Sequence, residues 1–245
     1  MKRKLYISFS FKQFVTCTMV AMMAVCMVFA LDLYYVNTMA SASEELPVII
    51  IDAGHGGEDG GTQSASGILE KDINLSIALK VDAMFKLLGF ETILVREGDY
   101  LIYDFSSTTI SQKKVSDIHN RMAIMTSYPN SIFLSIHQNY YEESQYSGAQ
   151  VFYSGNTEQS AIIAQFLQDS IVTSLQEDNT REIKQSGTEI YLLYNAITPA
   201  VMVECGFLSN EEEAEKLNDE EYQQQMSAAI VSGIVDYLSS VDNIE

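Results

Sequence analysis

The sequence predicts a single α/β domain with a largely parallel, twisted sheet flanked by helices, preceded by an N-terminal hydrophobic segment. Two observations support this fold class. Apolar runs rich in β-branched residues, such as Val48–Ile51, are typical of strands that are buried on both faces. Between these runs lie longer segments with an apolar residue every three or four positions, which is the spacing of amphipathic helices.

Length and composition fit one such domain and a short targeting segment. The chain has 245 residues, of which 47% are hydrophobic, and this is enough for one well-formed core. Its formal net charge of -19 repels polyanions, so we expect no nucleic-acid partner and no affinity for an anionic membrane surface. Beyond the N-terminal region the one thiol is Cys205, which rules out an intrachain disulfide framework.

The N-terminus predicts export. An apolar segment, Phe14–Leu31, follows a basic head and precedes Asp32, which is the layout of a secretory signal or a signal anchor. The basic residues are Lys2, Arg3, Lys4 and Lys12. Such a segment nearly spans a hydrocarbon core of about 30 Å, so we expect an uncleaved membrane anchor. Cleavage after Ala42, within an A-x-A motif, is the alternative.

These features divide the chain into three parts. We assign residues 1–42 to the signal peptide or membrane anchor, 43–46 to a linker, and 47–241 to one folded domain. In either reading of the N-terminus, the folded domain lies outside the cytoplasm.

The elements of the domain follow one another from Val48. Strands are expected at Val48–Ile51, Phe90–Val95, Ser131–Ile136, Gln150–Tyr153, Thr188–Leu193 and Ala200–Glu204. Helices are expected at Lys71–Leu88, Lys113–Ser127, Glu158–Leu175 and Glu221–Leu238, with a further helix start at Ser209–Glu212. Residues 97–112 show no period, and we expect a long loop that acts as a lid or a docking site.

Polar side chains follow three of the predicted strands. His55 comes after the first strand on a glycine-rich turn, His137 comes directly after Ser131–Ile136, and Glu204 ends Ala200–Glu204. The carboxyl ends of parallel strands meet at one edge of a sheet, so these side chains can converge although they are far apart in the sequence. A carboxylate directly after a buried apolar run costs free energy unless it is paired or used.

Two imidazoles and one carboxylate, with a fourth position left to water, form the ligand set of a catalytic zinc site. A further carboxylate then serves as the general base. The carboxylates available are Glu58, Asp59, Glu70, Asp72 and Glu204. Of these, Glu70 opens a helix from which it can reach back over the His55 turn.

Four blocks of this sequence resemble those of the zinc-dependent N-acetylmuramoyl-L-alanine amidases (amidase type 3). They are Asp52–Gly57, Glu70–Asp72, Ser135–Asn139 and Glu204–Asn210, in family order and spacing over residues 47–240. The resemblance implies one Zn²⁺ held by His55, Glu70 and His137, with Glu204 as the catalytic carboxylate. It also implies an Asn beside the metal at Asn139, and substrate-facing or structural roles for Arg96, Asp99 and Arg121.

The implied reaction is hydrolysis of the amide between N-acetylmuramic acid and L-alanine of the peptidoglycan stem peptide. The short chain and its hydrophobic N-terminus resemble the germination-specific, spore-cortex amidases, in which this step leads to muramic-δ-lactam. That subgroup implies an envelope location, such as the forespore intermembrane space, and an accessory sporulation protein as partner. The alternatives are a non-catalytic peptidoglycan-binding regulator on the same fold, and another exported zinc hydrolase such as a deacetylase or a peptidase.

Other reactive residues have structural interpretations. Cys205 is expected to be a small buried hydrophobe on the strand face opposite Glu204 rather than a ligand or nucleophile. His119 flanks a helical apolar stripe and is expected at the surface. Tyr140, Tyr141 and Tyr146 could stack on sugar rings or simply pack.

Overall fold

The computed structural model describes residues 16, 18–19, 22–23, 25–30 and 46–242, and the chain divides into two units, Met1–Leu46 and Pro47–Glu245. In the first unit, the described residues between 16 and 30 are helical. No helix among the described residues is long and apolar enough to cross a membrane. The predicted anchor lies partly outside the described residues, and the candidate cleavage site at Ala42 lies wholly outside them.

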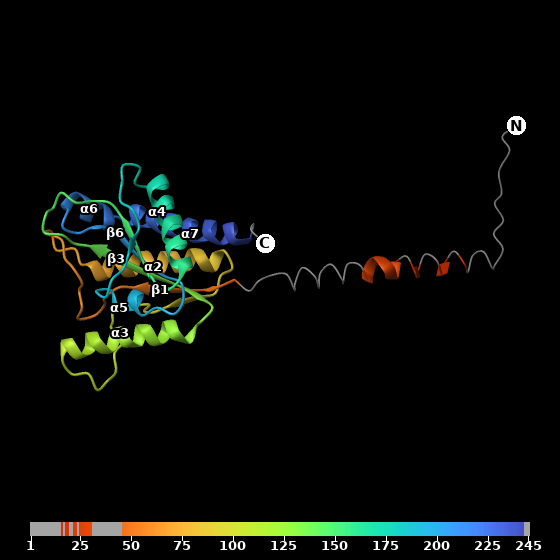
Figure 1. Cartoon of the computed structure of the whole chain (residues 1–245), viewed down its shortest axis with the longest axis horizontal. Helices are drawn as coiled ribbons and strands as arrows, with labels where there is room; N and C mark the ends of the chain where they lie inside the picture. Colours follow the sequence, from red (N-terminus) through yellow and green to blue (C-terminus); the bar gives the residue numbers. More distant parts are fainter. Residues whose placement is uncertain (1–15, 17, 20–21, 24, 31–45, 243–245) are drawn as a thin grey trace. The chain divides into compact units, whose positions relative to one another are not determined.

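The second unit is built on a sheet with the strand order β2-β1-β3-β6-β4-β5 (Figure 1). The strands are β1 (Val48–Ala53), β2 (Thr92–Leu94), β3 (Ser131–Asn139), β4 (Gln150–Tyr153), β5 (Lys184–Gln185) and β6 (Ala200–Phe207). Within the described residues every pairing is parallel except that of β4 with β6. The sheet is therefore mixed. The predicted parallel pairing holds for every described strand pair except β4 with β6.

Helices cover both faces of this sheet. They are α2 (Glu70–Leu87), α3 (Ile110–Ser127), α4 (Glu158–Ser174), α5 (Tyr191–Tyr194), α6 (Glu211–Leu217) and α7 (Glu220–Asp242). The larger core lies between the sheet and α2, α4 and α7, where Ile49 and Ile51 of β1 meet Ile73 and Ile77 of α2. A smaller core lies on the opposite face, where Ile50 and other strand residues pack against α3 and α5 (Figure 1).

The successive isoleucines of β1 show why the run Val48–Ile51 contains no polar residue. Ile49 and Ile51 belong to the larger core, whereas Ile50 belongs to the smaller one, and all three are fully buried. A strand that is covered on both faces needs apolar residues at every position. This confirms the reading of Val48–Ile51 as a doubly buried strand.

The structure corrects several predicted boundaries. The expected strand Thr188–Leu193 is wrong, because its last three residues belong to helix α5, which packs Leu192 and Leu193 against the smaller core. A short apolar run does not distinguish a strand from a buried helical turn. Strands β3 and β6 are longer than expected and end at Asn139 and Phe207, and the two-residue strand β5 was not predicted.

Helix α3 begins at Ile110, before the predicted start at Lys113. Its N-cap is Thr109, whose hydroxyl accepts a hydrogen bond from the Gln112 backbone N–H, while the Gln112 side chain accepts one from the Thr109 backbone. This reciprocal arrangement is a capping box. The expected loop is therefore shortened at its C-terminal end. In α6 the N-cap is Asn210, which accepts from the Glu213 N–H.

Candidate metal centre

His55, Glu70 and His137 lie together at the carboxyl edge of β1 and β3, and their ligating atoms are all within 4.8 Å of one another. Glu70 Oε1 lies 3.2 Å from His55 Nε2 and 2.9 Å from His137 Nδ1. Glu70 reaches the cluster from the first residue of α2, where a carboxylate suits the positive end of a helix. Among the described residues this is the one group of metal-type ligands that meets these distances.

The spacing of the three donors fits a small metal ion. Donors that lie about 2.0–2.1 Å from one tetrahedral zinc ion are roughly 3.4 Å from each other. The two distances from Glu70 Oε1, 3.2 Å and 2.9 Å, are close to that value. Two imidazoles and one carboxylate are also a ligand set that zinc uses in catalytic sites.

Electrostatics of the cluster favour a positive charge between these side chains. Burial alone would lower the pKa of His55, but hydrogen bonds to Asp59 and Glu70 raise it to about 9. Burial alone would raise the pKa of Glu70, but the two histidines hold it well below its usual range. These side chains therefore stabilise a positive charge that lies between them, whether a proton or a metal cation carries it.

Glycines make room for the cluster. A Cβ atom on Gly54 would overlap the His137 imidazole, and one on Gly61 would overlap Glu70 and crowd His55. His55 itself has a φ of 61°, the one positive value for a non-glycine residue in the described chain. Such a conformation costs roughly 1 kcal/mol or more, and it persists where the surroundings hold it.

Two buried arginines hold the turn after β1. Arg96 donates to the Ala53 and Gly54 carbonyls at 2.9 Å and 3.0 Å. Arg121 donates to the Ala53 and His55 carbonyls at 2.9 Å and 2.8 Å. Their exposed fractions are 1% and 3%, so these contacts are shielded from water. Both arginines thus position the ligand-bearing turn and do not line an open site.

A buried ion pair supports Arg121. Its guanidinium contacts Asp52, and its Nε donates to Asp117 at 2.7 Å. The Ser135 hydroxyl also donates to Asp52 Oδ2 at 2.7 Å. Burial alone would raise the pKa of Asp52, but Arg121 and the Ser135 hydroxyl hold it below its usual range. The carboxylate of the D-A-G-H block is therefore structural.

Glu204 lies directly beside the cluster, because residues 204 and 137 are register partners on β6 and β3. Its Oε2 is buried and has no hydrogen-bond partner among the described residues. Burial raises the pKa of Glu204 to about 7, although the two histidines pull it down. A carboxylate that titrates near neutral pH can both accept and return a proton.

The other predicted carboxylates lie outside the cluster. Glu58 is exposed and pairs with Lys113 at 2.9 Å, and Asp72 is exposed on α2. Asp59 touches His55 on the side away from the cluster, with Oδ2 2.9 Å from Nδ1. Asp99 accepts from Lys71 at 2.7 Å and from the Gly57 backbone at 2.6 Å, and so ties the segment after β2 to the turn.

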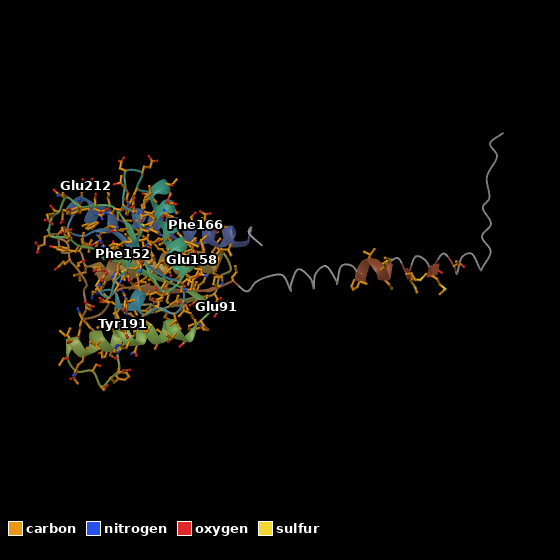
Figure 2. The ribbon with its side chains drawn as sticks, viewed as in Figure 1. Glu91, Phe152, Glu158, Phe166, Tyr191 and Glu212 are labelled. Atoms are coloured by element: carbon orange, nitrogen blue, oxygen red, sulfur yellow. The ribbon has the colours of Figure 1, made fainter. Side chains whose placement is uncertain are left out.

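The remaining candidates are placed as follows. The side-chain oxygen of Asn139 accepts a hydrogen bond of 2.8 Å from the Tyr140 backbone N–H. Cys205 is fully buried in the larger core, and burial raises the pKa of its thiol, in agreement with the expected apolar role. His119 is exposed on α3, and its ring lies 5.6 Å from that of Tyr191, the side chain labelled in Figure 2. The three tyrosines Tyr140, Tyr141 and Tyr146 are exposed.

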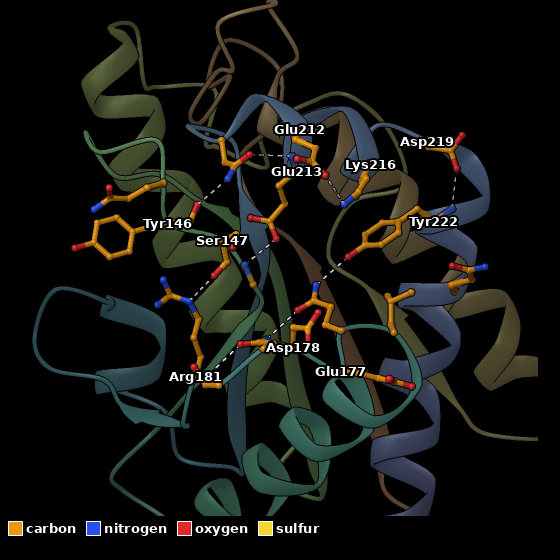
Figure 3. A pocket seen from close by; sticks show the side chains of 18 of the residues that line it. Tyr146, Ser147, Glu177, Asp178, Arg181, Glu212, Glu213, Lys216, Asp219 and Tyr222 are labelled. Atoms are coloured by element: carbon orange, nitrogen blue, oxygen red, sulfur yellow. Dashed lines mark hydrogen bonds and ion pairs between the residues drawn. The ribbon is translucent and has the colours of Figure 1, made fainter.

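A separate cavity of about 890 Å³ lies beside α6 and the segment after α4 (Figure 3). Its polar floor includes Glu213, which accepts from the Gly148 and Phe207 backbones at 2.8 Å and 2.7 Å. The charged residues that line it are mostly acidic, with Arg181 and Lys216 as cations. The three clustered ligands and Glu204 do not line this cavity.

Two imidazoles and a carboxylate around one point, with a further buried carboxylate beside them, are the arrangement of a metal-dependent hydrolase. Comparison with known proteins agrees. A family model described as N-acetylmuramoyl-L-alanine amidase matches residues 49–236. The chain belongs to the N-acetylmuramoyl-L-alanine amidase family, as its four sequence blocks indicated.

The chain is also similar to individual amidases of this family. The germination-specific N-acetylmuramoyl-L-alanine amidase of Bacillus subtilis (strain 168) is 33% identical over 192 residues, which are 78% of this chain and 80% of the relative. The CwlD amidase from Clostridioides difficile, solved in complex with the GerS lipoprotein, is 40% identical with a TM-score of 0.76. That likeness covers 79% of this chain and 99% of CwlD.

Proposed function

We propose that this chain is a zinc hydrolase that cleaves the amide between N-acetylmuramic acid and L-alanine of the peptidoglycan stem peptide. Family membership over residues 49–236 supports the activity. The observation that carries the proposal is the convergence of His55, Glu70 and His137 beside Glu204, since this is the machinery that amide hydrolysis requires.

His55, Glu70 and His137 would hold one zinc ion. Zinc supplies a Lewis acid that polarises the scissile carbonyl and lowers the pKa of water toward ~7. Other residues of the chain position the three ligands. Gly54 and Gly61 leave space for them, and Arg96 and Arg121 keep the His55 turn in place.

Glu204 acts as the general base and then as the general acid. Its carboxylate takes a proton from the attacking water and returns it to the leaving nitrogen of L-alanine, so that proton and charge balance over the cycle. Its buried, unpartnered Oε2 and its pKa of about 7 suit both roles. Asn139, two residues beyond His137 on β3, is proposed to contact substrate.

The cell-wall substrate is proposed to be spore cortex, where this cleavage would be the first step toward muramic-δ-lactam. The likeness to the germination-specific amidase of Bacillus subtilis supports a role in germination. We also propose that residues 1–42 export or anchor the chain, that residues 43–46 link them to the amidase domain at 47–241, and that an accessory sporulation protein binds it. The GerS lipoprotein bound to CwlD supports such a partner.

Muropeptide analysis tests the activity. Purified peptidoglycan digested with the full-length protein should yield stem peptides with free L-alanine N-termini and intact glycan chains. Release of acetate would instead indicate a deacetylase, and cleavage inside the stem would indicate a peptidase. Spores of a strain that lacks the chain should lose δ-lactam, and normal δ-lactam would contradict the cortex assignment.

A further inference from the structure

Asp59 forms a contact with the candidate metal centre that the reaction described above does not use. Its Oδ2 lies 2.9 Å from His55 Nδ1, and its Oδ1 lies 2.6 Å from Lys114 Nζ. The side chain is 14% exposed, so the carboxylate is largely shielded from water. One carboxylate thus joins a metal-ligating imidazole to a cation on helix α3.

The contact decides which nitrogen of His55 can bind metal. A neutral imidazole has one N–H and one free lone pair. An ionised carboxylate accepts hydrogen bonds and donates none, so Asp59 requires the N–H on Nδ1. In the neutral form of His55, which is the form that can bind metal, the lone pair is then on Nε2, the atom that lies 3.2 Å from Glu70 Oε1 inside the cluster.

The backbone holds Asp59 in place beneath His55. The Gly56 and Asp59 backbones exchange two hydrogen bonds of 2.9 Å, which close the turn, and the Gly61 N–H reaches Asp59 Oδ1 at 3.3 Å. Lys114 then adds a charge-assisted contact from a different element. The carboxylate is therefore fixed from both sides before any metal arrives.

We propose that Asp59, held by Lys114, is a positioning residue that fixes the ligating tautomer and orientation of His55 and so raises the affinity of the cluster for zinc. The proposal rests on the proposed function for the identity of the three ligands. Carboxylates in this position behind a metal-bound histidine typically contribute 10–100-fold in metal affinity.

Zinc affinity of full-length variants tests this. D59A should weaken zinc binding by about 10–100-fold, measured by competition with a chromophoric chelator. D59N, which keeps an acceptor oxygen for the Nδ1–H but loses the charge, should fall between D59A and the wild type. K114M should weaken binding by at most about fivefold, because Lys114 is half exposed.

Glu58 supplies the matched control. E58Q removes the same charge one residue earlier and breaks a similar ion pair with Lys113, but Glu58 contacts none of the ligands. Its zinc affinity should equal that of the wild type. Added zinc should also restore the amidase rate of D59A, whereas a fault in folding would not be repaired by metal; the thermal unfolding of the metal-free proteins is compared in parallel.

Equal zinc affinity for D59A and E58Q would overturn the inference, as would a wild-type chain that binds no zinc. The amidase assay tests the proposed function independently of the zinc measurements. If the wild type binds zinc and the variants follow the expected order but no amide is cleaved, the proposed function fails while the role of Asp59 stands.

Discussion

Glu70 and Glu204 are carboxylates at the same edge of the sheet, but their partners give them opposite protonation behaviour. Glu70 faces two histidines within hydrogen-bonding distance, and they hold its pKa well below the usual range. Glu204 has a buried oxygen with no partner, and burial raises its pKa to about 7. One is suited to bind a cation and the other to move a proton.

The variant E204Q separates these two roles. The amide keeps the size of the side chain but cannot take up a proton, so bound zinc should stay at the wild-type level while turnover falls by about 10²–10⁴-fold or more. Metal content by atomic absorption and muropeptide release measure the two properties. Wild-type turnover would remove Glu204 from the mechanism.

The variant E70A should lose metal instead. It removes the oxygen that lies 3.2 Å from His55 and 2.9 Å from His137, so the zinc content of the purified protein should drop well below one ion per chain. E58A, which shortens an exposed acid on the neighbouring turn, is the matched comparison. Full zinc occupancy in E70A would remove Glu70 from the proposed ligand set.

At the scale of elements, the site depends on how closely the turn after β1 approaches β3. Gly54 lies against the His137 imidazole, and a methyl group there would occupy the position of the ring. The sequence indicated a glycine-rich turn, but it did not indicate which glycine faced which ring, because that depends on the pairing of β1 with β3.

G54A should therefore displace His137 and weaken zinc binding, with little change in secondary structure by circular dichroism. G60A is the control, since a Cβ atom on Gly60 would meet only Leu69, at an ordinary 3.5 Å. Equal zinc affinity in the two variants would show that His137 tolerates the added methyl group.

The elements also show what could be predicted from the sequence and why the rest could not. The unbroken run at Val48–Ile51 has to be a doubly buried strand, and its periodic neighbours have to be helices. By contrast, the apolar run in Thr188–Leu193 is too short for its period to be decisive, and tertiary packing on the smaller core makes Tyr191–Tyr194 helical. The convergence of His55, His137 and Glu204 at the strand ends was predictable, whereas the buried contacts of Arg96 and Arg121 depend on the pairing of distant segments.

At the scale of the whole molecule, the buried pair of Asp52 and Arg121 links stability to pH. The pKa of Asp52 is lower in the folded protein than in the unfolded chain, where it is about 3.9. Its contribution is therefore complete above about pH 4 and is lost as the pH falls through the folded value.

Urea unfolding at pH 7 and at pH 3.5 measures this contribution. D52N should cost about 1–3 kcal/mol at pH 7, since it removes one of the two carboxylates that pair with the buried Arg121, and should lose less stability than the wild type on acidification. S135A, which removes one hydrogen bond to Asp52, should cost about 1 kcal/mol at pH 7. Parallel pH profiles for wild type and D52N would contradict the assignment.

The pairing of β1 with β3 determines when, during folding, the candidate metal site forms. The donors at residues 55, 70 and 137 come together only after β1 has paired with β3, a contact between distant parts of the chain. An unfolded chain therefore has no preformed place for the ion. A zinc ion held by the proposed ligands would therefore bind only after the central strands have assembled, and scarcity of zinc from that stage on would leave a folded but inactive protein.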